Sequence, residues 1–436
     1  MASPEQHPLP LLFLIGDTGG GHRSAAAAVQ QALDGAAPGR FETVTCDALR
    51  GPDVFWLQRW WSGLYGPCIR LTPWLWWSFW RSSQSPRMLY LARHTLMGAV
   101  YGSVARAIQA SQPALIVVFH PMTTDPAVRA RNRGGVGAQV VTVITDLVTA
   151  HLSWRDAPVD RVVVPSAAVA DSFARDGVPP ERYVPLGLPV AAEFCRPPLN
   201  GAERADLKRQ LGARGKFLVV LTGGAEGSGG LHRRATAILR HCEDVDVAVI
   251  CGRNRSLRRR LGKLAARAGD GRLTVHGFID NMADWLRCAD VVVGKAGPGT
   301  IAEATCCGVP LVLTSYVRGQ EKGNIKFVTD AGAGPGDELR VALLLTGHER
   351  GEHERRPAAG GLRDGTRACL PHHEVGAAQP VGHVADKAVR GKPAVAVAVR
   401  EPGHPPPQRA VAAADHRDVH AVHPPEDRGG PAAQAA

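Results

Sequence analysis

Two glycine-rich segments, far apart in the chain, each follow a short run of apolar residues. The first, Gly16–His22, comes after Leu11–Ile15, and the second, Gly294–Ala304, comes after Val291–Val293. In α/β proteins, a strand followed by a glycine-rich turn and a helix directs free backbone N–H groups and a helix N-terminus toward an anionic ligand. One such segment is weak evidence. Two at this separation predict paired Rossmann-like lobes that face each other across a cleft.

Apolar, β-branched runs alternate with helical patterns through the first 334 residues, which predicts an α/β protein. The runs lack polar alternation, as is typical of strands buried on both faces of a parallel sheet. The strands are expected at 11–15, 41–46, 115–119, 140–144 and 162–164, then at 217–221, 245–251, 273–275, 291–293 and 309–313. Helices are expected at 24–33, 167–175 and 282–288, among others. Proline, asparagine and glycine between residues 189 and 211 predict a linker, so we assign 1–195 to the first lobe and 196–334 to the second.

The composition is that of a protein with two hydrophobic cores. The chain has 436 residues, of which 44% are apolar, and a formal net charge of +11. Nine cysteines include no C-x-x-C pair, so we interpret them as buried or incidental thiols in a reducing compartment. No basic region precedes the first apolar run, and no run reaches the roughly 18 apolar residues of a membrane span. We therefore expect a cytoplasmic protein.

Residues 335–436 differ in composition from the rest of the chain. They hold nine of the seventeen histidines and many prolines, but no Phe, Trp, Tyr, Ile or Met. Such a segment cannot bury enough apolar surface to offset its ordering entropy, and no metal-ligand spacing recurs among its histidines. We expect a disordered tail. A reading-frame error in a GC-rich gene is an alternative origin, and resequencing across codon 334 would test it.

Residues 54–107 contain no Asp or Glu and are rich in tryptophan and arginine. Seven of the nine tryptophans lie here, namely Trp56, Trp60, Trp61, Trp74, Trp76, Trp77 and Trp80. Tryptophan favours the headgroup level of a bilayer, and arginine favours anionic lipid. We predict that this segment docks on a membrane surface. The alternative is an unusually aromatic pair of core helices.

Seven short blocks occur in an order found in one group of enzymes. They are Gly19–His22, Thr145–Leu147 (with His151 and Trp154 close behind), Gly187–Val190, Cys251–Asn254, Gly277–Met282, Lys295–Ala304 and Gly319–Asn324. From about residue 10 to 334, the chain resembles the monogalactosyldiacylglycerol synthases and processive diacylglycerol glucosyltransferases. These are relatives of the MurG-type transferases with the GT-B fold. The resemblance implies a GT-B fold and transfer of a sugar from a UDP-sugar to diacylglycerol.

The resemblance implies a UDP-sugar site in the second lobe. The glycines would bring backbone N–H groups to the diphosphate at a helix N-terminus, where the helix dipole stabilises developing charge. Phe278 would lie against uracil, and Glu303 would accept the ribose hydroxyls. Gln320, Glu321 and Asn324 would hold the sugar. The implied residues are Gly223, Gly224, Phe278, Gly297, Gly299, Thr300, Glu303, Gln320, Glu321 and Asn324.

We expect His22 to act as the catalytic base, because it begins a helix beyond a glycine turn and imidazole titrates near neutral pH. Its alternative role is to cap or orient the loop. Asp17 and Asp146 are second candidates, as base or as the group that orients it, since a carboxylate is a weaker base unless its surroundings raise its pKa. The residues expected at the acceptor site or membrane are Gly20, Gly21, Asp146, His151, Trp154, Trp74, Trp76 and Trp77.

Asp244-Val245-Asp246 superficially resembles a metal-binding D-x-D motif. It precedes an apolar strand, whereas ligands that reach a cleft should follow one, so we interpret it as a turn. We expect no metal and no cofactor besides the donor substrate. Ala296 and Pro298 stand where the family often has a Pro-Gly-Gly run, and Lys322 replaces a common acid. The final helices that brace the lobes in GT-B proteins have no recognisable counterpart.

The resulting hypothesis is an inverting glycosyltransferase that moves galactose or glucose from a UDP-sugar to diacylglycerol at the inner face of a membrane. The expected partners are a UDP-hexose, diacylglycerol and an anionic membrane surface, with no nucleic acid. Two alternatives are a MurG-like transfer of N-acetylglucosamine to a polyprenyl-linked acceptor and an inactive lipid- and nucleotide-binding remnant. A dinucleotide-dependent oxidoreductase is disfavoured, because the first glycine segment lacks the G-x-G-x-x-G spacing.

Overall fold

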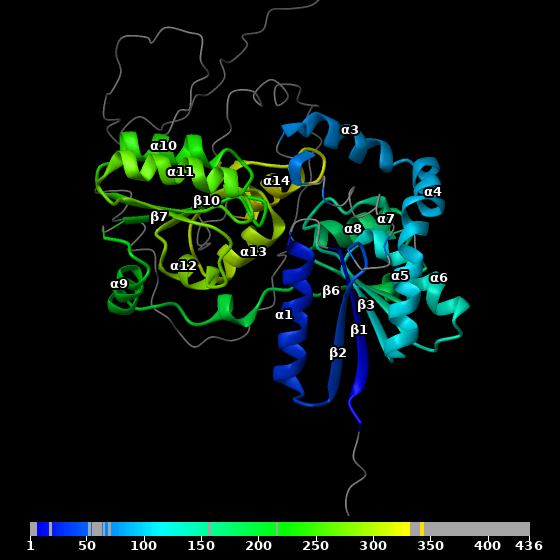
Figure 1. The fold of residues 1–436 in the computed structure, drawn as a ribbon. Coiled ribbons are helices and arrows are strands. Elements are labelled where there is room, and N and C mark those ends of the chain that lie inside the picture. Colours follow the sequence, from blue (N-terminus) through cyan, green and yellow to red (C-terminus); the bar gives the residue numbers. More distant parts are fainter. Residues whose placement is uncertain are drawn as a thin grey trace, which may run out of the picture.

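The structure is a computed structural model that describes residues 7–16, 20–50, 54, 63, 66–68, 71–155, 158–214, 217–331 and 341–343. These residues form two α/β lobes, each built on a six-stranded sheet in which every strand pair is parallel (Figure 1). Asp17, Trp56, Trp60, Trp61 and all of the tail except 341–343 lie outside the described residues. The predictions made for them stay predictions.

The N-terminal lobe has the strand order β2-β1-β3-β4-β5-β6, the flavodoxin-like doubly wound order with one strand added. Its strands are β1 (Leu9–Ile15), β2 (Phe41–Asp47), β3 (Leu115–Val118), β4 (Gln139–Val143), β5 (Arg161–Val164) and β6 (Tyr183–Pro185). Its helices are α1 (Gly21–Ala36), α3 (Pro73–Ser83), α4 (Pro86–His94), α5 (Leu96–Ser111), α6 (Pro121–Arg133), α7 (Leu152–Arg155) and α8 (Ala167–Arg175), with short 3-10 turns at Pro180–Arg182 and Ala192–Cys195.

The C-terminal lobe has the order β12-β11-β10-β7-β8-β9, which is the Rossmann order when counted from β7. Its strands are β7 (Phe217–Thr222), β8 (Val245–Ile250), β9 (Leu273–His276), β10 (Val291–Lys295), β11 (Leu311–Ser315) and β12 (Val341–Leu343). Its helices are α9 (Gly201–Gln210), α10 (Leu231–His241), α11 (Arg255–Ala268), α12 (Met282–Cys288), α13 (Pro298–Cys306) and α14 (Lys322–Ala331). Strand β12 lies beyond residue 334, so the sheet extends past the expected end of this lobe.

Both sheets are buried on both faces, as their continuous apolar strands predict. In β1, Leu12 and Leu14 face one apolar cluster, and Leu11, Phe13 and Ile15 face the other. The sheet of the C-terminal lobe is covered in the same way on its two faces. The ten predicted strands are therefore confirmed within about two residues at each end. The sequence missed β6, a three-residue edge strand that ends in proline, and β12.

The linker region contains a helix that the sequence analysis did not predict. Asn200 was interpreted as linker chemistry, but it is the N-cap of α9. Its Oδ1 accepts the backbone N–H groups of Ala202 and Glu203, and the Glu203 carboxylate accepts the N–H of Asn200. This reciprocal pair is a capping box, the signature of a helix start.

The acid-free segment 54–107 divides into an exposed part and a core part. Helix α3 has no buried residue, and Trp74 is 65% exposed. Helix α5, in contrast, packs against the sheet through Val100 and Val104, which are fully buried. The prediction of a docking surface over the whole segment is therefore wrong for the buried face of α5, and for the earlier residues it stays a prediction. The described helices include none that is long and apolar enough to cross a membrane.

The carboxyl ends of the two sheets carry loops that meet each other. Leu147, in the loop after β4, belongs to the apolar cluster of the C-terminal lobe. A Cβ atom added at Gly323, in α14, would lie 2.9 Å from side-chain atoms of Val148 and Thr149. Two doubly wound lobes whose strand ends face each other form the predicted GT-B architecture (Figure 1).

Candidate active site

His22 lies in the first turn of α1, as predicted, and contacts the loop after β4. Its Nδ1 is 2.9 Å from Oγ1 of Thr145, and its ring meets that of His120 edge-on at 4.6 Å between centroids. His120 is buried, and its pKa is held well below the ordinary value by burial and, secondarily, by the charge of His22. His120 is therefore neutral near pH 7. The sequence analysis assigned no role to Thr145 or His120, although each directly follows a predicted strand.

Asp146 connects the two lobes. Its Oδ2 accepts the indole N–H of Trp154 at 2.7 Å, and its Oδ1 accepts Nε2 of Gln320 from the other lobe at 3.2 Å. Burial raises the pKa of Asp146 and the Glu321 carboxylate adds to this, while the two hydrogen bonds oppose it. Both carboxylate oxygens are engaged, so the structure favours a positioning role over that of a base.

Two residues expected at the acceptor site have structural contacts instead. Trp154 is fully buried in the core of the N-terminal lobe and holds Asp146. His151 connects α3 to this lobe, because its Nε2 lies 2.9 Å from Oγ of Ser83 and its Nδ1 lies 2.7 Å from Oγ of Ser153. Burial, with a smaller effect from a nearby arginine, lowers the pKa of His151 to about 4. A neutral imidazole therefore holds α3 in place at physiological pH.

The glycine loop after β7 touches the loop that leads to His22. A Cβ atom added at Gly20 would lie 2.8 Å from Cβ of Ala225, so the two loops pack without room for a side chain. Within the loop after β7, a Cβ atom at Gly223 would lie 2.1 Å from the backbone of Ser228, and Gly224 has a φ of +66°. Gly21, by contrast, begins α1 with no atom near the position of a Cβ. The contact between Gly20 and Ala225 places His22 beside the predicted phosphate loop.

Helix α13 begins within the second glycine-rich segment, directly after Gly297. Pro298 is at its first position, where a missing N–H costs no hydrogen bond, so the substitution noted in the sequence is compatible with a helix start. The N–H groups of Gly299 and Thr300 follow in the first turn, where helical amides have no intrahelical acceptor. Gly297, at the N-cap, allows a close approach because it lacks a side chain. The helix start expected at this segment is therefore present, and anion binding by its N–H groups stays a prediction.

Lys295 and Glu321 form an ion pair in the middle of the predicted donor site. Oε1 of Glu321 contacts Nζ of Lys295, and its Oε2 accepts the backbone N–H of Val317 at 2.8 Å. Glu321 is 3% exposed. No role was predicted for Lys295, which belongs to one of the matching blocks. Its place at the carboxyl end of a central parallel strand is a signal that could have identified it.

Two buried amide oxygens near this pair have no hydrogen-bond partner in the described structure. They are Oε1 of Gln320 and Oδ1 of Asn324. Asn324 is 1% exposed and is held in place by its Nδ2, which donates to the carbonyl of Ala296 at 2.9 Å. Buried polar atoms of folded proteins are almost always paired. These oxygens are therefore able to accept hydrogen bonds from a ligand.

Glu303 and Phe278 are the two residues expected to contact the nucleoside, and a Cβ atom added at Gly299 would lie 3.8 Å from Oε1 of Glu303. Glu303 is half-buried in α13, and burial, helped by the Glu193 carboxylate, raises its pKa to about 7. Phe278 is 60% exposed, with the Arg253 guanidinium 5.7 Å from its ring centroid. An exposed aromatic ring next to a cation is suited to stacking against a planar base.

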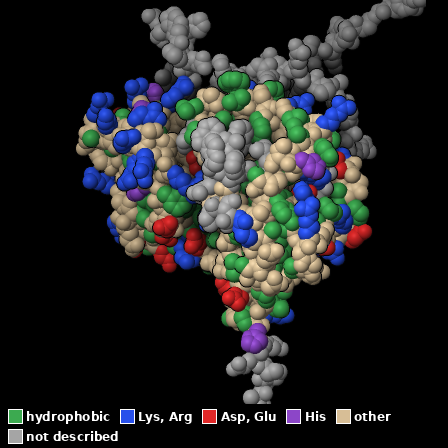
Figure 2. Space-filling model, turned by 45° about the vertical axis from the view of Figure 1, so that its right-hand side comes forward, with side chains coloured by type: hydrophobic (Ala, Val, Ile, Leu, Met, Phe, Trp, Pro, Cys, Tyr) green, Lys and Arg blue, Asp and Glu red, His purple; other side chains and the backbone are tan. Residues whose placement is uncertain are grey.

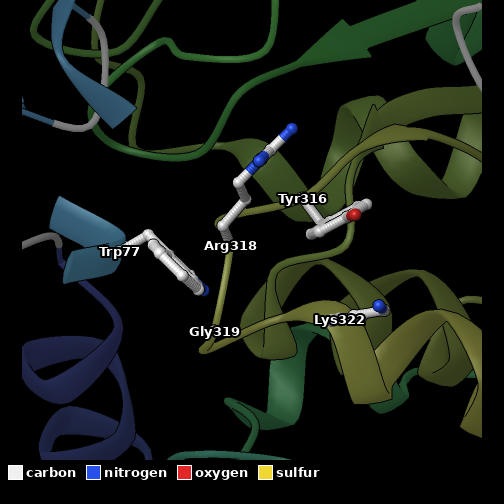
Figure 3. A pocket seen from close by; sticks show the side chains of 5 residues that line it. All are labelled: Trp77, Tyr316, Arg318, Gly319 and Lys322. Atoms are coloured by element: carbon white, nitrogen blue, oxygen red, sulfur yellow. The ribbon is translucent and has the colours of Figure 1, made fainter. Parts of the chain in front are cut away.

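A cavity of about 240 Å³ lies between α3 and the C-terminal lobe, which is called the donor lobe because the UDP-sugar site is predicted there. Figure 3 shows Trp77 of α3 pointing toward Gly319, with Tyr316, Arg318 and Lys322 on the other side. Beside it, Trp80 packs so closely on Gly319 that an added Cβ atom would lie 2.5 Å from the indole. Helix α3 thus contacts both lobes. Trp76 is half-buried beside Phe79, so Trp74 and Trp77 are the more exposed of the predicted membrane tryptophans.

The D-x-D motif is not the turn that the sequence analysis predicted. Strand β8 begins at Val245, and Asp246 is buried within it, where its carboxylate accepts the backbone N–H of Arg214. Among the described residues, no group of three or more His, Cys, Asp and Glu side chains is arranged to hold a metal ion.

The family model for monogalactosyldiacylglycerol (MGDG) synthase matches residues 22–190, and that for the glycosyltransferase family 28 C-terminal domain matches residues 218–336. The chain is 31% identical over 340 residues to monogalactosyldiacylglycerol synthase from Spinacia oleracea, which covers 76% of this chain and 63% of the relative. It is 32% identical over 335 residues to monogalactosyldiacylglycerol synthase 3 from Arabidopsis thaliana, which covers 74% and 70%. A crystal structure of Acinetobacter baumannii MurG is similar with a TM-score of 0.45 at 17% identity, covering 77% and 86%.

The chain spans just under two thirds of the length of the spinach relative, while its match to the Arabidopsis relative exceeds that share. The two family models cover most of both lobes, and the stretch between them, residues 191–217, carries α9. His22, Asp146 and Asn324 fall inside the matched ranges, whereas Gly20 lies just before the first of them. The chain therefore belongs to the monogalactosyldiacylglycerol synthase family.

Proposed function

We propose that this protein transfers a hexose from a UDP-sugar to the free hydroxyl of diacylglycerol at a membrane surface, with inversion at the anomeric carbon. The observation that carries the proposal is the contact between Gly20 and Ala225, because it brings the His22 end of α1 to the predicted phosphate loop. The name of the curated relatives, monogalactosyldiacylglycerol synthase, supports diacylglycerol as the acceptor. Galactose and glucose are both candidates for the sugar.

His22 is the proposed general base. When its Nδ1–H donates to the Thr145 hydroxyl, Nε2 keeps a lone pair that can take the proton of the acceptor hydroxyl. The deprotonated oxygen then attacks the anomeric carbon as the bond to UDP breaks. Neutral His120, against the His22 ring, adds no positive charge that would disfavour proton transfer to His22.

The donor lobe stabilises the leaving diphosphate and holds the sugar. The N–H groups of Gly299 and Thr300 at the start of α13 would donate to the phosphates, where a helix N-terminus favours negative charge. The unpaired oxygens of Gln320 and Asn324 would accept sugar hydroxyls. Glu303 would accept the ribose hydroxyls, and Phe278 would stack on uracil. These assignments include no metal, and backbone amides would meet the diphosphate charge.

The membrane surface is proposed as the place of reaction. Eight of the thirteen exposed large apolar side chains of the described residues lie between 71 and 91, namely Leu71, Trp74, Leu75, Trp77, Phe79, Met88, Tyr90 and Leu91. Helix α11 adds six exposed basic residues and no acid: Arg255, Arg258, Arg259, Arg260, Lys263 and Arg267. Helices α3, α10 and α11 lie along the same upper side of the molecule in Figure 1, and Figure 2 shows apolar side chains along the top with basic ones grouped beside them. An apolar patch beside a cationic one is suited to anionic lipid.

The direct test is an assay with radiolabelled donors on vesicles that contain diacylglycerol. UDP-galactose, UDP-glucose and UDP-N-acetylglucosamine are compared at equal concentration, and the labelled lipid is separated and identified. Labelled hexosyl-diacylglycerol from one of the first two donors supports the proposal. Transfer only from UDP-N-acetylglucosamine to a polyprenyl-linked acceptor, or no transfer despite nucleotide binding, would overturn it.

A further inference from the structure

Lys295 lies between the two glycine loops of the donor lobe. An added Cβ atom at Gly297 would lie 3.0 Å from its Nζ, and one at Gly224 would lie 3.7 Å from its Cε. A Cβ atom at Gly229 would lie 3.8 Å from the Cβ of Lys295. The lysine stem therefore crosses from one loop to the other, and its amine ends beside the N-cap of α13. These glycines leave space along the stem that a larger residue would fill.

Glu321, the ion-pair partner of Lys295, is also one of the residues expected to bind the donor sugar. Both oxygens of Glu321 are engaged, one with Lys295 and the other with the backbone N–H of Val317. Its neighbours Gln320 and Asn324 each keep an unpaired buried oxygen, whereas Glu321 has none. Lys295 therefore competes with a sugar hydroxyl for Oε1 of Glu321 for as long as the ion pair persists.

We propose that the diphosphate of the bound nucleotide takes Lys295 from Glu321, and that this exchange frees the Glu321 carboxylate to accept a hydroxyl of the donor sugar. The inference rests on the proposed function and deepens it, since it makes Lys295 a diphosphate-binding residue and Glu321 a sugar-binding residue that becomes available in second place. No covalent bond changes in this exchange. The lysine keeps its proton and trades one anionic partner for another.

The physical basis is a competition between two anions for one cation. An ammonium group is a compact charge on a flexible stem with three donors, so a shift of its amine from one acceptor to another needs only side-chain rotation. A diphosphate at the start of α13 also receives the N–H groups of Gly299 and Thr300, which Glu321 does not. The carboxylate left behind keeps the N–H of Val317 and gains a sugar hydroxyl, so it is not left uncompensated.

The test compares UMP with UDP, because they differ only by the β-phosphate. Affinities are measured by calorimetry for the wild type, Lys295→Met, Glu321→Gln and the double variant Lys295→Met/Glu321→Gln. In the double variant we expect UDP affinity to fall by about tenfold or more while UMP affinity changes less than about threefold, as for loss of one charge-assisted hydrogen bond. In Glu321→Gln alone, UDP should bind at least as tightly as in the wild type, because no carboxylate competes for the lysine.

The second half of the proposal is tested with UDP-galactose and UDP-glucose. If the wild type binds a UDP-sugar more tightly than UDP, this difference in affinity should be lost in Glu321→Gln. Loss of the difference supports the assignment, and an unchanged difference overturns it.

A purely structural ion pair would behave differently. Lys295→Met alone leaves a buried carboxylate without its cation and should melt at a lower temperature, and the double variant should recover. If UDP affinity recovers together with stability, Lys295 only holds Glu321 and the proposal is wrong. The matched control is Lys326→Met/Asp330→Asn, which removes an exposed ion pair from α14 and should leave both affinities unchanged. A wild type that binds neither UMP nor UDP would overturn the proposed function itself, whereas normal UDP binding by the double variant overturns only this inference.

Discussion

At the scale of single residues, the proposed chemistry depends on which nitrogen of His22 carries its proton. The hydroxyl of Thr145, 2.9 Å from Nδ1, is the group that can hold the useful tautomer, and it comes from the loop after β4. His120 on the other side is neutral because it is buried. The imidazole is therefore oriented by residues of two separate segments, the loops after β3 and β4, both in the N-terminal lobe.

Replacement of His22 by alanine is expected to lower the rate of transfer by about 10²–10⁴-fold, the usual loss for a general base. UDP affinity should stay nearly the same, because the nucleotide binds the other lobe. Steady-state kinetics and UDP calorimetry on the same preparation measure both. Thr145→Val is the matched variant and should lose less activity, since it removes only the orienting group. Equal losses of rate and UDP affinity in His22→Ala would instead assign His22 to the donor site.

Glu303 predicts a pH dependence of stability. Its pKa is about 7 in the folded protein and 4.5 ordinarily, so the folded state binds a proton that the unfolded state has released between these values. The free energy of unfolding should therefore fall as pH rises from about 4.5 to 7 and change no further above that. Glu303→Gln removes this contribution. Thermal melts between pH 4.5 and 8 should show a shallower decline in the variant, and parallel curves would contradict the raised pKa.

The same residue should affect nucleotide binding in the opposite direction. Ionised Glu303 accepts ribose hydroxyls better than the protonated acid, so UDP affinity should rise between pH 6 and 8. The phosphate of UDP also titrates, but it does so equally with wild type and Glu303→Gln. The difference between the two proteins isolates the carboxylate. Unchanged UDP affinity in Glu303→Gln at pH 8 would remove Glu303 from the site.

At the scale of elements, helix α3 has two different faces. Trp74 and Trp77 are exposed, whereas Trp80 packs on Gly319 of the donor lobe and lies 6.0 Å from the His151 ring. His151 and Gln84 hold the end of the helix to the acceptor lobe through Ser83 and the N–H of Leu152. The helix is thus positioned by both lobes and still presents an apolar surface outward.

Replacing Trp74 and Trp77 by serine should release the protein from anionic vesicles without unfolding it, because neither ring is in the core. Trp80→Ser should lower the melting temperature, because its ring fills the contact with Gly319. Vesicle flotation and a thermal melt of each variant distinguish the two faces. A folded Trp74→Ser/Trp77→Ser protein that still floats would place the docking surface elsewhere.

Helix α11 should supply the electrostatic part of the same attachment. Neutralising Arg255, Arg259 and Lys263 with glutamine is expected to weaken binding to anionic vesicles by about 1 kcal/mol per residue near the surface. Raised salt should weaken the wild type in the same way, since exposed charges are screened over ~8 Å at physiological ionic strength. The test measures binding to vesicles of increasing anionic lipid content, at low and at raised salt. If salt weakens binding of the variant as strongly as binding of the wild type, α11 does not contribute to the attachment.

At the scale of the whole molecule, the proposed catalysis depends on the close contact between the two lobes at their glycine loops. Gly20 has a φ of +88°, and its missing side chain lets Ala225 approach. Asp146 and Gln320 add a hydrogen bond across the same boundary, and Leu147 contributes to the apolar cluster of the other lobe. The lobes are therefore held in register by a polar and an apolar contact beside His22.

Gly20→Ala should reduce the rate of transfer about tenfold or more by separating these loops, with UDP affinity retained, because even a 1 Å misplacement can cost 10²-fold. Gly39→Ala is the matched control, since Gly39 also has a positive φ but nothing lies near its Cβ position. The double variant Gly20→Ala/Ala225→Gly removes the clash and should recover activity. Failure of this rescue would mean that strained backbone at residue 20, and not the lobe contact, causes the loss.

The sequence by itself determined the two lobes and all their strands except β6 and β12. Short, continuous apolar runs that alternate with helical patterns are typical of strands in a sheet covered on both faces, and a glycine turn followed by a helical pattern indicates the region where α1 and α13 begin. These are local signals, carried by residues close together in the chain. The resemblance to a known family then identified most residues that line the lobe contact.

Only the tertiary structure decided what those residues touch. Trp154 and His151 match the family blocks, yet one is a core residue that holds Asp146 and the other holds α3. The pairing of Lys295 with Glu321 joins positions 26 residues apart in sequence, and that of Asp146 with Gln320 joins positions 174 apart. Such contacts depend on which loops the parallel strands bring to the same sheet edge and on how the two lobes meet. No local pattern of residue types indicates which loops share a sheet edge or how the two lobes meet.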